Sequence, residues 1–205
     1  MLLRRVWIVL FLLGFGGLVA IAIHFTGEKR RVPDDPAKEF SNFKPLANGI
    51  SRTKQIALYE GLPHQHFQRA LLEQELQTKK TLQLHEFPFY PEPLDLSDAD
   101  ALQLEKLILD KDSFREMRFN TKKACGGFHP DFAVEFSSRD ELYHVLICCG
   151  CVEIKIYGPK NALYCDVRPT AHDKLVALLN PYHKYRPTKL DPPTEVPLLF
   201  EPSGN

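Results

Sequence analysis

The chain has 205 residues, with 26 basic and 26 acidic side chains that leave a formal net charge of zero. A balanced charge provides no electrostatic footprint for a polyanion, so we expect no nucleic-acid partner. The length suits one domain with appendages, and many of the 16 prolines lie before or after the segments that read as helices and strands.

The N-terminal segment predicts a membrane anchor over residues 1–25. Residues 6–23 contain no charged side chain, and about 20 such residues span a bilayer, so residues 6–25 are expected to contact lipid. The alternative is a cleaved signal peptide, with a charged start at Arg4-Arg5 and a cleavage site at Ala20-Ile21-Ala22. The apolar run is longer than the roughly 7–15 residues of a signal peptide, which favours a single-pass anchor.

The basic residues do not orient this anchor. Equal numbers flank the apolar run, namely Arg4, Arg5 and the amino terminus before it and Lys29, Arg30 and Arg31 after it. The positive-inside rule therefore leaves the side of the globular domain open.

Three further segments follow the anchor. Residues 26–50 contain charges and prolines with little apolar periodicity and predict a linker, and residues 51–186 predict an α+β globular domain. Residues 187–205 are rich in proline and predict an extended or disordered tail.

The first half of the domain predicts a β-α-β start. Its elements are a strand over 54–60, a helix from Pro63 to about Thr78, and a strand over 81–87. The expected inner side of the helix consists of Phe67, Ala70, Leu71 and Gln74.

Two capping patterns predict further helices. Ser97 with Asp100 begins one that runs to Asp110, and Thr170 with Asp173 begins one that Pro181 ends. A short strand is expected between them over 114–119.

Residues 142–157 predict a β-hairpin, because 16 residues exceed the usual strand of roughly 3–10. A two-residue turn at Cys149-Gly150 pairs Ile147 with Val152, Val145 with Ile154, and Tyr143 with Ile156. The alternate pairs are Leu146 with Glu153 and His144 with Lys155. This register gives one apolar face and one mostly polar face.

Strands over 131–137 and 162–167 extend the hairpin to an antiparallel meander of about 131–167. An antiparallel sheet commonly packs one face on the core, so about three helices should cover the apolar face.

Four residues form the candidate metal site: Cys125, His129, Cys148 and Cys151. The spacings C-x3-H and C-x2-C supply four soft ligands, a set that Zn²⁺ accepts, and the turn brings the last two sulfurs together. The alternatives are a Cys148–Cys151 disulfide, a redox dithiol, and buried thiols that act as small apolar residues. For Cys165 the buried interpretation is preferred.

Catalytic motifs such as G-x-S-x-G and H-E-x-x-H are absent from the sequence. A hydrolase using His129 and Asp131 is the least favoured hypothesis. The sequence instead predicts a membrane-anchored accessory or binding domain with a protein partner, and the alternative is a zinc-like or thiol-redox protein that uses the Cys/His cluster.

Overall fold

The computed structural model describes residues 36–118 and 126–189. The expected anchor, Cys125 and most of the proline-rich tail lie outside these residues. None of the helices in the described segments is both long and apolar enough to cross a bilayer.

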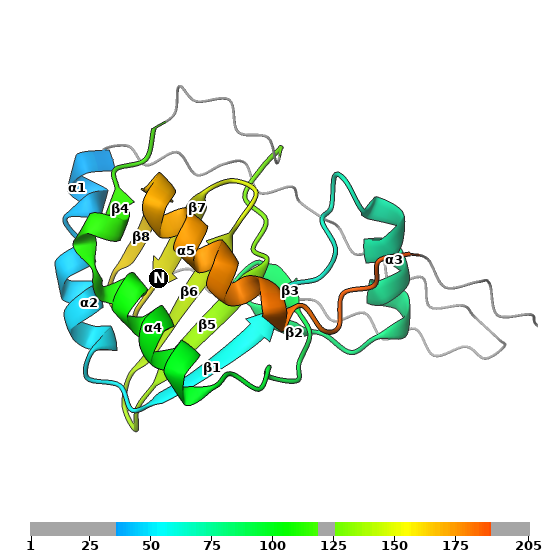
Figure 1. Ribbon diagram of the computed structural model, residues 1–205, viewed down its shortest axis with the longest axis horizontal. Helices are drawn as coiled ribbons and strands as arrows, with labels where there is room; N and C mark the ends of the chain where they lie inside the picture. The colour runs from blue at the N-terminus through cyan, green and yellow to red at the C-terminus, as the bar shows by residue number, and fades with distance from the viewer. Residues whose placement is uncertain (1–35, 119–125, 190–205) are drawn as a thin grey trace, which may run out of the picture.

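A six-stranded antiparallel sheet forms the centre of this α+β protein, in the order β1-β5-β6-β7-β8-β4 (Figure 1). Its strands are β1 Gln55–Glu60, β4 Phe114–Arg115, β5 Phe132–Ser137, β6 Leu142–Cys148, β7 Glu153–Tyr157 and β8 Ala162–Val167. The predicted meander is thus confirmed as β5 to β8. Sequential neighbours pair here because short turns, such as the one closed by Gly158 N–H and the Asn161 carbonyl oxygen at 2.9 Å, return the chain at once.

Helices cover one face of this sheet, where the main core lies (Figure 1). They are α1 Pro36–Phe40, α2 Phe43–Ile50, α4 Asp98–Leu109 and α5 Pro169–Leu179, with short 3₁₀ turns at Lys111–Ser113 and Asn180–Tyr182. Ser97 caps α4 as predicted, since its Oγ accepts a hydrogen bond from Asp100 N–H at 3.2 Å. The cap of α5 is different: Arg168 occupies that position without a side-chain bond, and Pro169 begins the helix.

Part of the expected linker belongs to the domain. Within 26–50, residues 36–50 form α1 and α2, and the core buries Phe43, Leu46 and Ile50. The three apolar residues recur at spacings of three and four, which puts them on one face of a helix that Pro45 does not interrupt because it lies in the first turn.

The β-α-β start is wrong in topology, although its elements exist. Helix α3 spans Arg69–Thr78 rather than starting at Pro63, and it stands apart from the other helices (Figure 1). It buries Leu72 and Glu75, whereas the expected inner residue Phe67 is 69% exposed. Strand β2 Leu82–Leu84 pairs with β3 Phe87–Phe89 in a separate two-stranded sheet and not with β1.

The hairpin turn is longer than predicted. Four residues, 149–152, connect β6 to β7, and the positive φ of 59° belongs to Val152 rather than to Gly150. Ile147 therefore pairs with Ile154 and Val145 with Ile156. The displacement is two residues, so every side chain keeps the face that the sequence predicted, because side chains alternate with period two.

The second face of the sheet is also partly buried, which the sequence did not predict. A smaller cluster covers it, contributed by the β2–β3 hairpin, Met117, Phe128 and the sheet itself. Glu153 and Lys155, expected on a polar face, are 1% and 6% exposed. Glu153 accepts a hydrogen bond from the Tyr164 hydroxyl, and Lys155 Nζ pairs with Glu86 Oε1 at 3.0 Å, so both buried polar groups have partners.

Candidate functional site

The structure brings three of the four predicted ligands to one end of the sheet. His129 lies in the segment before β5, Cys148 ends β6 and Cys151 lies in the following turn. Cys148 Sγ accepts hydrogen bonds from the backbone N–H groups of Cys151, at 3.2 Å, and of His129. The contact between His129 and the sulfur is therefore made by the main chain.

The imidazole of His129 is directed elsewhere. Its Nε2 lies 3.0 Å from the carbonyl oxygen of Leu62, in the segment after β1. Burial is the largest cause that lowers the pKa of His129 to about 4, the positive charge of Arg186 lowers it further, and the nearby carboxylate of Asp131 opposes both. The ring is therefore neutral at pH 7 and donates through Nε2.

The described cysteines differ in state. Cys151 is disulfide-bonded, whereas Cys148, Cys149 and Cys165 are free thiols, so the alternative Cys148–Cys151 disulfide is not formed. Burial raises the pKa of Cys148 and of Cys149 to about 12, which keeps both protonated at neutral pH. Cys165 lies in the main core beside β7, as the sequence predicted.

A metal centre is not assembled within residues 36–118 and 126–189, since no three His, Cys, Asp or Glu side chains there are placed to hold one ion. The four-ligand prediction includes Cys125, outside those ranges, and so stays a prediction.

The Asp131 carboxylate connects the turn after β6 to the C-terminal segment and does not orient the His129 ring. Its Oδ2 accepts the backbone N–H of Cys149 at 2.8 Å, and its Oδ1 pairs with Arg186 Nη1 at 3.0 Å. Arg186 also donates to the carbonyl oxygen of Gly61, from Nε at 3.1 Å and from Nη2 at 2.9 Å. Gly61 is required here because a Cβ at this position would clash with the carbonyl oxygen of Pro130.

Glu60 is a buried titratable residue of this site that the sequence analysis did not identify. It is fully buried and accepts hydrogen bonds from His183 Nδ1 at 2.9 Å and from the backbone N–H groups of Lys184 at 2.9 Å and Tyr185 at 2.6 Å. Burial acts to raise the pKa of Glu60, but these bonds outweigh it and hold the pKa below its ordinary value. The alternating pattern of β1 could have revealed Glu60, because it places this carboxylate on the buried side, where it needs hydrogen-bond donors.

A cluster of aromatic rings lies beside this network. The His64 ring is 4.5 Å from that of His129, 5.8 Å from that of His66 and 4.7 Å from that of Phe67. Two positions apart on a regular helix, His64 and His66 would point in different directions. They meet because residues 64–68 form a turn, in which His64 Nδ1 accepts the backbone N–H of His66 at 3.0 Å.

Taken together, the titratable groups of this end hold segments together: the turn after β6, the segment after β1 and residues 183–186. The protein is, by its fold, an α+β protein built on a six-stranded antiparallel sheet. Comparison with models of known protein families, with curated proteins and with solved structures found no match in any of the three.

Proposed function

We propose that this protein is a non-catalytic accessory domain that binds a partner protein while an N-terminal apolar segment holds it at a membrane. The observation that carries the proposal is Phe67, a large apolar side chain that is 69% exposed on a hydrogen-bonded turn. Aromatic side chains on ordered surfaces are typical anchors of protein interfaces.

The turn that carries Phe67 is held at both ends. The backbone N–H of His64 donates to Gln68 Oε1 at 3.0 Å, and Gln68 N–H donates to the His64 carbonyl oxygen at 2.7 Å. A backbone turn already held in place loses little conformational entropy on binding, and burial of the Phe67 ring contributes about 1.5–3 kcal/mol.

The neighbouring chemistry supports binding rather than catalysis. The Cys148 and Cys149 thiols are protonated, His129 is neutral and bonded to a main-chain carbonyl, and Asp131 is paired with Arg186. A nucleophile needs a lowered pKa or an adjacent base, and these groups have neither.

A photo-crosslinking residue at position 67 of the full chain tests the proposed surface. The matched control is position 102, because Leu102 on α4 is also 69% exposed. We expect a discrete adduct with one membrane-associated protein from position 67 and none from position 102. Equal labelling from the two positions, or no adduct from either, contradicts the proposal.

The membrane association has its own test. Replacing Leu12 and Leu18 by arginine interrupts the apolar run of residues 6–23. Each charge near the centre of a spanning helix costs about 2.5–3.5 kcal/mol on insertion scales, so the variant should be extracted from membranes by alkaline carbonate while the unaltered chain is retained. Extraction of both proteins alike rejects the anchor.

The second candidate is a soft-metal centre at Cys125, His129, Cys148 and Cys151, which requires the disulfide of Cys151 to be reduced and the His129 ring to leave the Leu62 carbonyl oxygen. One observation favours it: the backbone N–H groups of Cys151 and His129 donate to Cys148 Sγ and act to lower its pKa, against the larger effect of burial. Elemental analysis of the full chain purified with a reductant decides it. Near-stoichiometric zinc that Cys148→Ser removes supports the centre, and a metal-free protein rejects it.

A further inference from the structure

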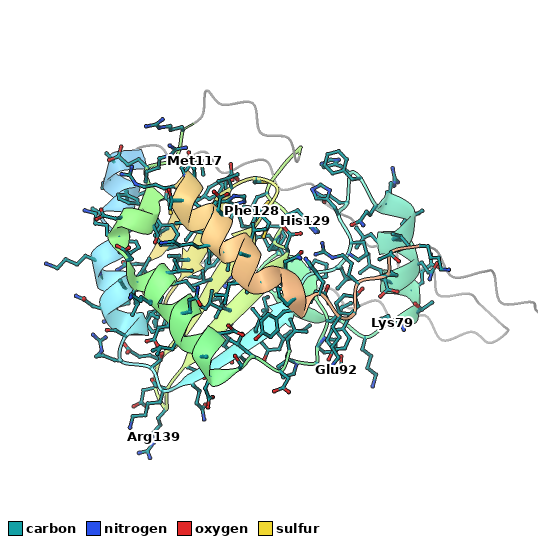
Figure 2. The ribbon with its side chains drawn as sticks, in the orientation of Figure 1. Lys79, Glu92, Met117, Phe128, His129 and Arg139 are labelled. Atoms are coloured by element: carbon teal, nitrogen blue, oxygen red, sulfur yellow. The ribbon has the colours of Figure 1, made fainter. Side chains whose placement is uncertain are left out.

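A surface depression of about 310 Å³ lies at the end of the sheet where β4 leaves it. Figure 2 places Met117 of this depression near the top of the view, far from Arg139 near the bottom. Its lining is Phe40, Arg115, Glu116, Met117, Arg118 and Arg168. Three of these six side chains are guanidinium groups and one is a carboxylate.

Two of the arginines retain donors for a ligand. Arg168 is exposed, and its Nε donates to the carbonyl oxygen of Phe114 at 3.1 Å, which holds the head group while its two terminal nitrogens bond to nothing in the described segments. Arg115 Nε is buried without a hydrogen-bond partner in those segments. The Asp166 carboxylate is 3.6 Å from that nitrogen, which makes an ion pair but not a hydrogen bond.

The apolar side of the depression is also defined. Met117 is 7% exposed, and Phe40 packs against the main core from α1. Lys111 Nζ lies 5.7 Å from the centre of the Phe40 ring and adds a fourth positive charge nearby. The depression thus combines a cationic rim with an apolar wall, at the lower limit of the roughly 300–1,000 Å³ of ligand pockets.

We infer that this depression binds a phosphate group, with Arg115 and Arg168 as its principal donors. A guanidinium fork matches two oxygens of a phosphate, and charge-assisted bonds of this kind are about twice as strong as neutral ones. A phosphate carries enough oxygens to accept from several forks at once, whereas a carboxylate has two.

The phosphate has two sources, a lipid headgroup or a soluble phosphate. The lipid source rests on the proposed function, because it requires the apolar run of residues 6–23 to lie in a bilayer. Twelve residues, 24–35, connect the end of that run to α1, so the start of α1, one helix length from Phe40, can lie at most about 45 Å from the membrane.

Calorimetric titration of the full chain in a neutral detergent tests the inference. The probes are inorganic phosphate, dioctanoyl phosphatidic acid and, as the zwitterionic comparison, dioctanoyl phosphatidylcholine. We expect Arg115→Gln and Arg168→Gln each to weaken binding of the anionic probes about 10-fold or more. Arg139→Gln, at the far end of the sheet, should leave it unchanged.

Arg168 also donates to the Phe114 carbonyl oxygen, so its replacement could weaken binding by disturbing the fold. A variant that is expected to bind phosphate more tightly therefore complements the two loss-of-binding variants. Glu116 is exposed and lines the depression, so Glu116→Gln should tighten phosphate binding about threefold without disturbing the fold. Tighter binding of phosphatidic acid than of inorganic phosphate assigns the site to lipid, and equal binding assigns it to soluble phosphate.

Two results overturn the inference. One is the absence of heat with both anionic probes, and the other is an equal loss with Arg139→Gln, which would mean non-specific attraction. Both are independent of the crosslinking and carbonate tests, so the phosphate site and the proposed function can fail separately.

Discussion

The Arg186 Nη1 atom lies 3.0 Å from Asp131 Oδ1, and the two residues are 55 positions apart in the chain. Both side chains are largely buried, with 13% and 18% of their surfaces exposed. Arg186 also bonds the carbonyl oxygen of Gly61, so one guanidinium joins the C-terminal segment to the residues that follow β1 and to the segment before β5.

Replacing Arg186 should therefore destabilise the domain. Arg186→Met leaves the Asp131 charge and the Gly61 carbonyl without their donor, and we expect a loss of about 2–4 kcal/mol in the free energy of unfolding by urea. The matched control is Arg52→Met, whose ion pair with Glu141 is 62% and 36% exposed and whose loss should cost under about 1 kcal/mol. Equal effects of the two substitutions would contradict this role for Arg186.

Acid should destabilise the domain through His129. Its pKa is about 4 in the folded chain and near 6.5 when exposed, so the unfolded chain binds the proton more readily. Stability is then full above pH 6.5 and falls as the pH drops toward 4, by on the order of 3 kcal/mol. His129→Gln keeps a donor for the Leu62 carbonyl and should flatten the unfolding free energy over this range. An unchanged pH profile in that variant excludes His129 as the cause.

The thiols of Cys148 and Cys149 should react slowly in the native chain. A pKa near 12 instead of 9 reduces the thiolate fraction about 1,000-fold at pH 8, and the thiolate is the reactive form. Peptide-resolved mass spectrometry after brief alkylation should find both residues unmodified in native protein and modified in urea. Rapid alkylation of either residue in the native protein would contradict the prediction that both thiols are protonated.

The buried Lys155 should tolerate one replacement and not another. Its Nζ lies 5.1, 4.8 and 5.2 Å from the ring centres of Phe87, Phe128 and Tyr164, and its partner Glu86 is 36% exposed. Lys155→Met fills the same space and leaves Glu86 in contact with water, so its unfolding free energy should change by less than about 1.5 kcal/mol. Lys155→Ala opens a cavity among the rings and should cost about 2–4 kcal/mol.

Thermal and urea unfolding of both variants measures this difference. If Lys155→Met is as damaging as Lys155→Ala, the ammonium charge rather than the filled volume supports the second face of the sheet.

Much of the C-terminal half of the fold was predictable because its interactions are local. The meander follows from alternating residues and short turns, and the Ser97 cap requires only residues three positions apart. The predicted strand pairing of the hairpin differs from the observed one by two residues. The observed turn needs a positive φ at Val152, and a β-branched residue rarely adopts one, so the sequence favours a shorter Cys-Gly turn.

The candidate site was predictable only in part. Cys151 N–H donates to Cys148 Sγ, as neighbours across one turn can, but local sequence does not specify that the His129 ring turns to the Leu62 carbonyl oxygen. Glu60 and Arg186 were missed as a pair of anchors because their partners lie more than 50 positions away.

The sequence by itself determined which residues alternate, where α4 begins and which turns return the chain, since these depend on neighbours a few positions apart. Only the tertiary structure decided that β2 leaves the main sheet, that residues 36–50 pack on the core, and that the polar face of β7 is covered. The physical reason is that each of these outcomes depends on distant segments competing to bury the same apolar surface, and no local pattern records which segment succeeds.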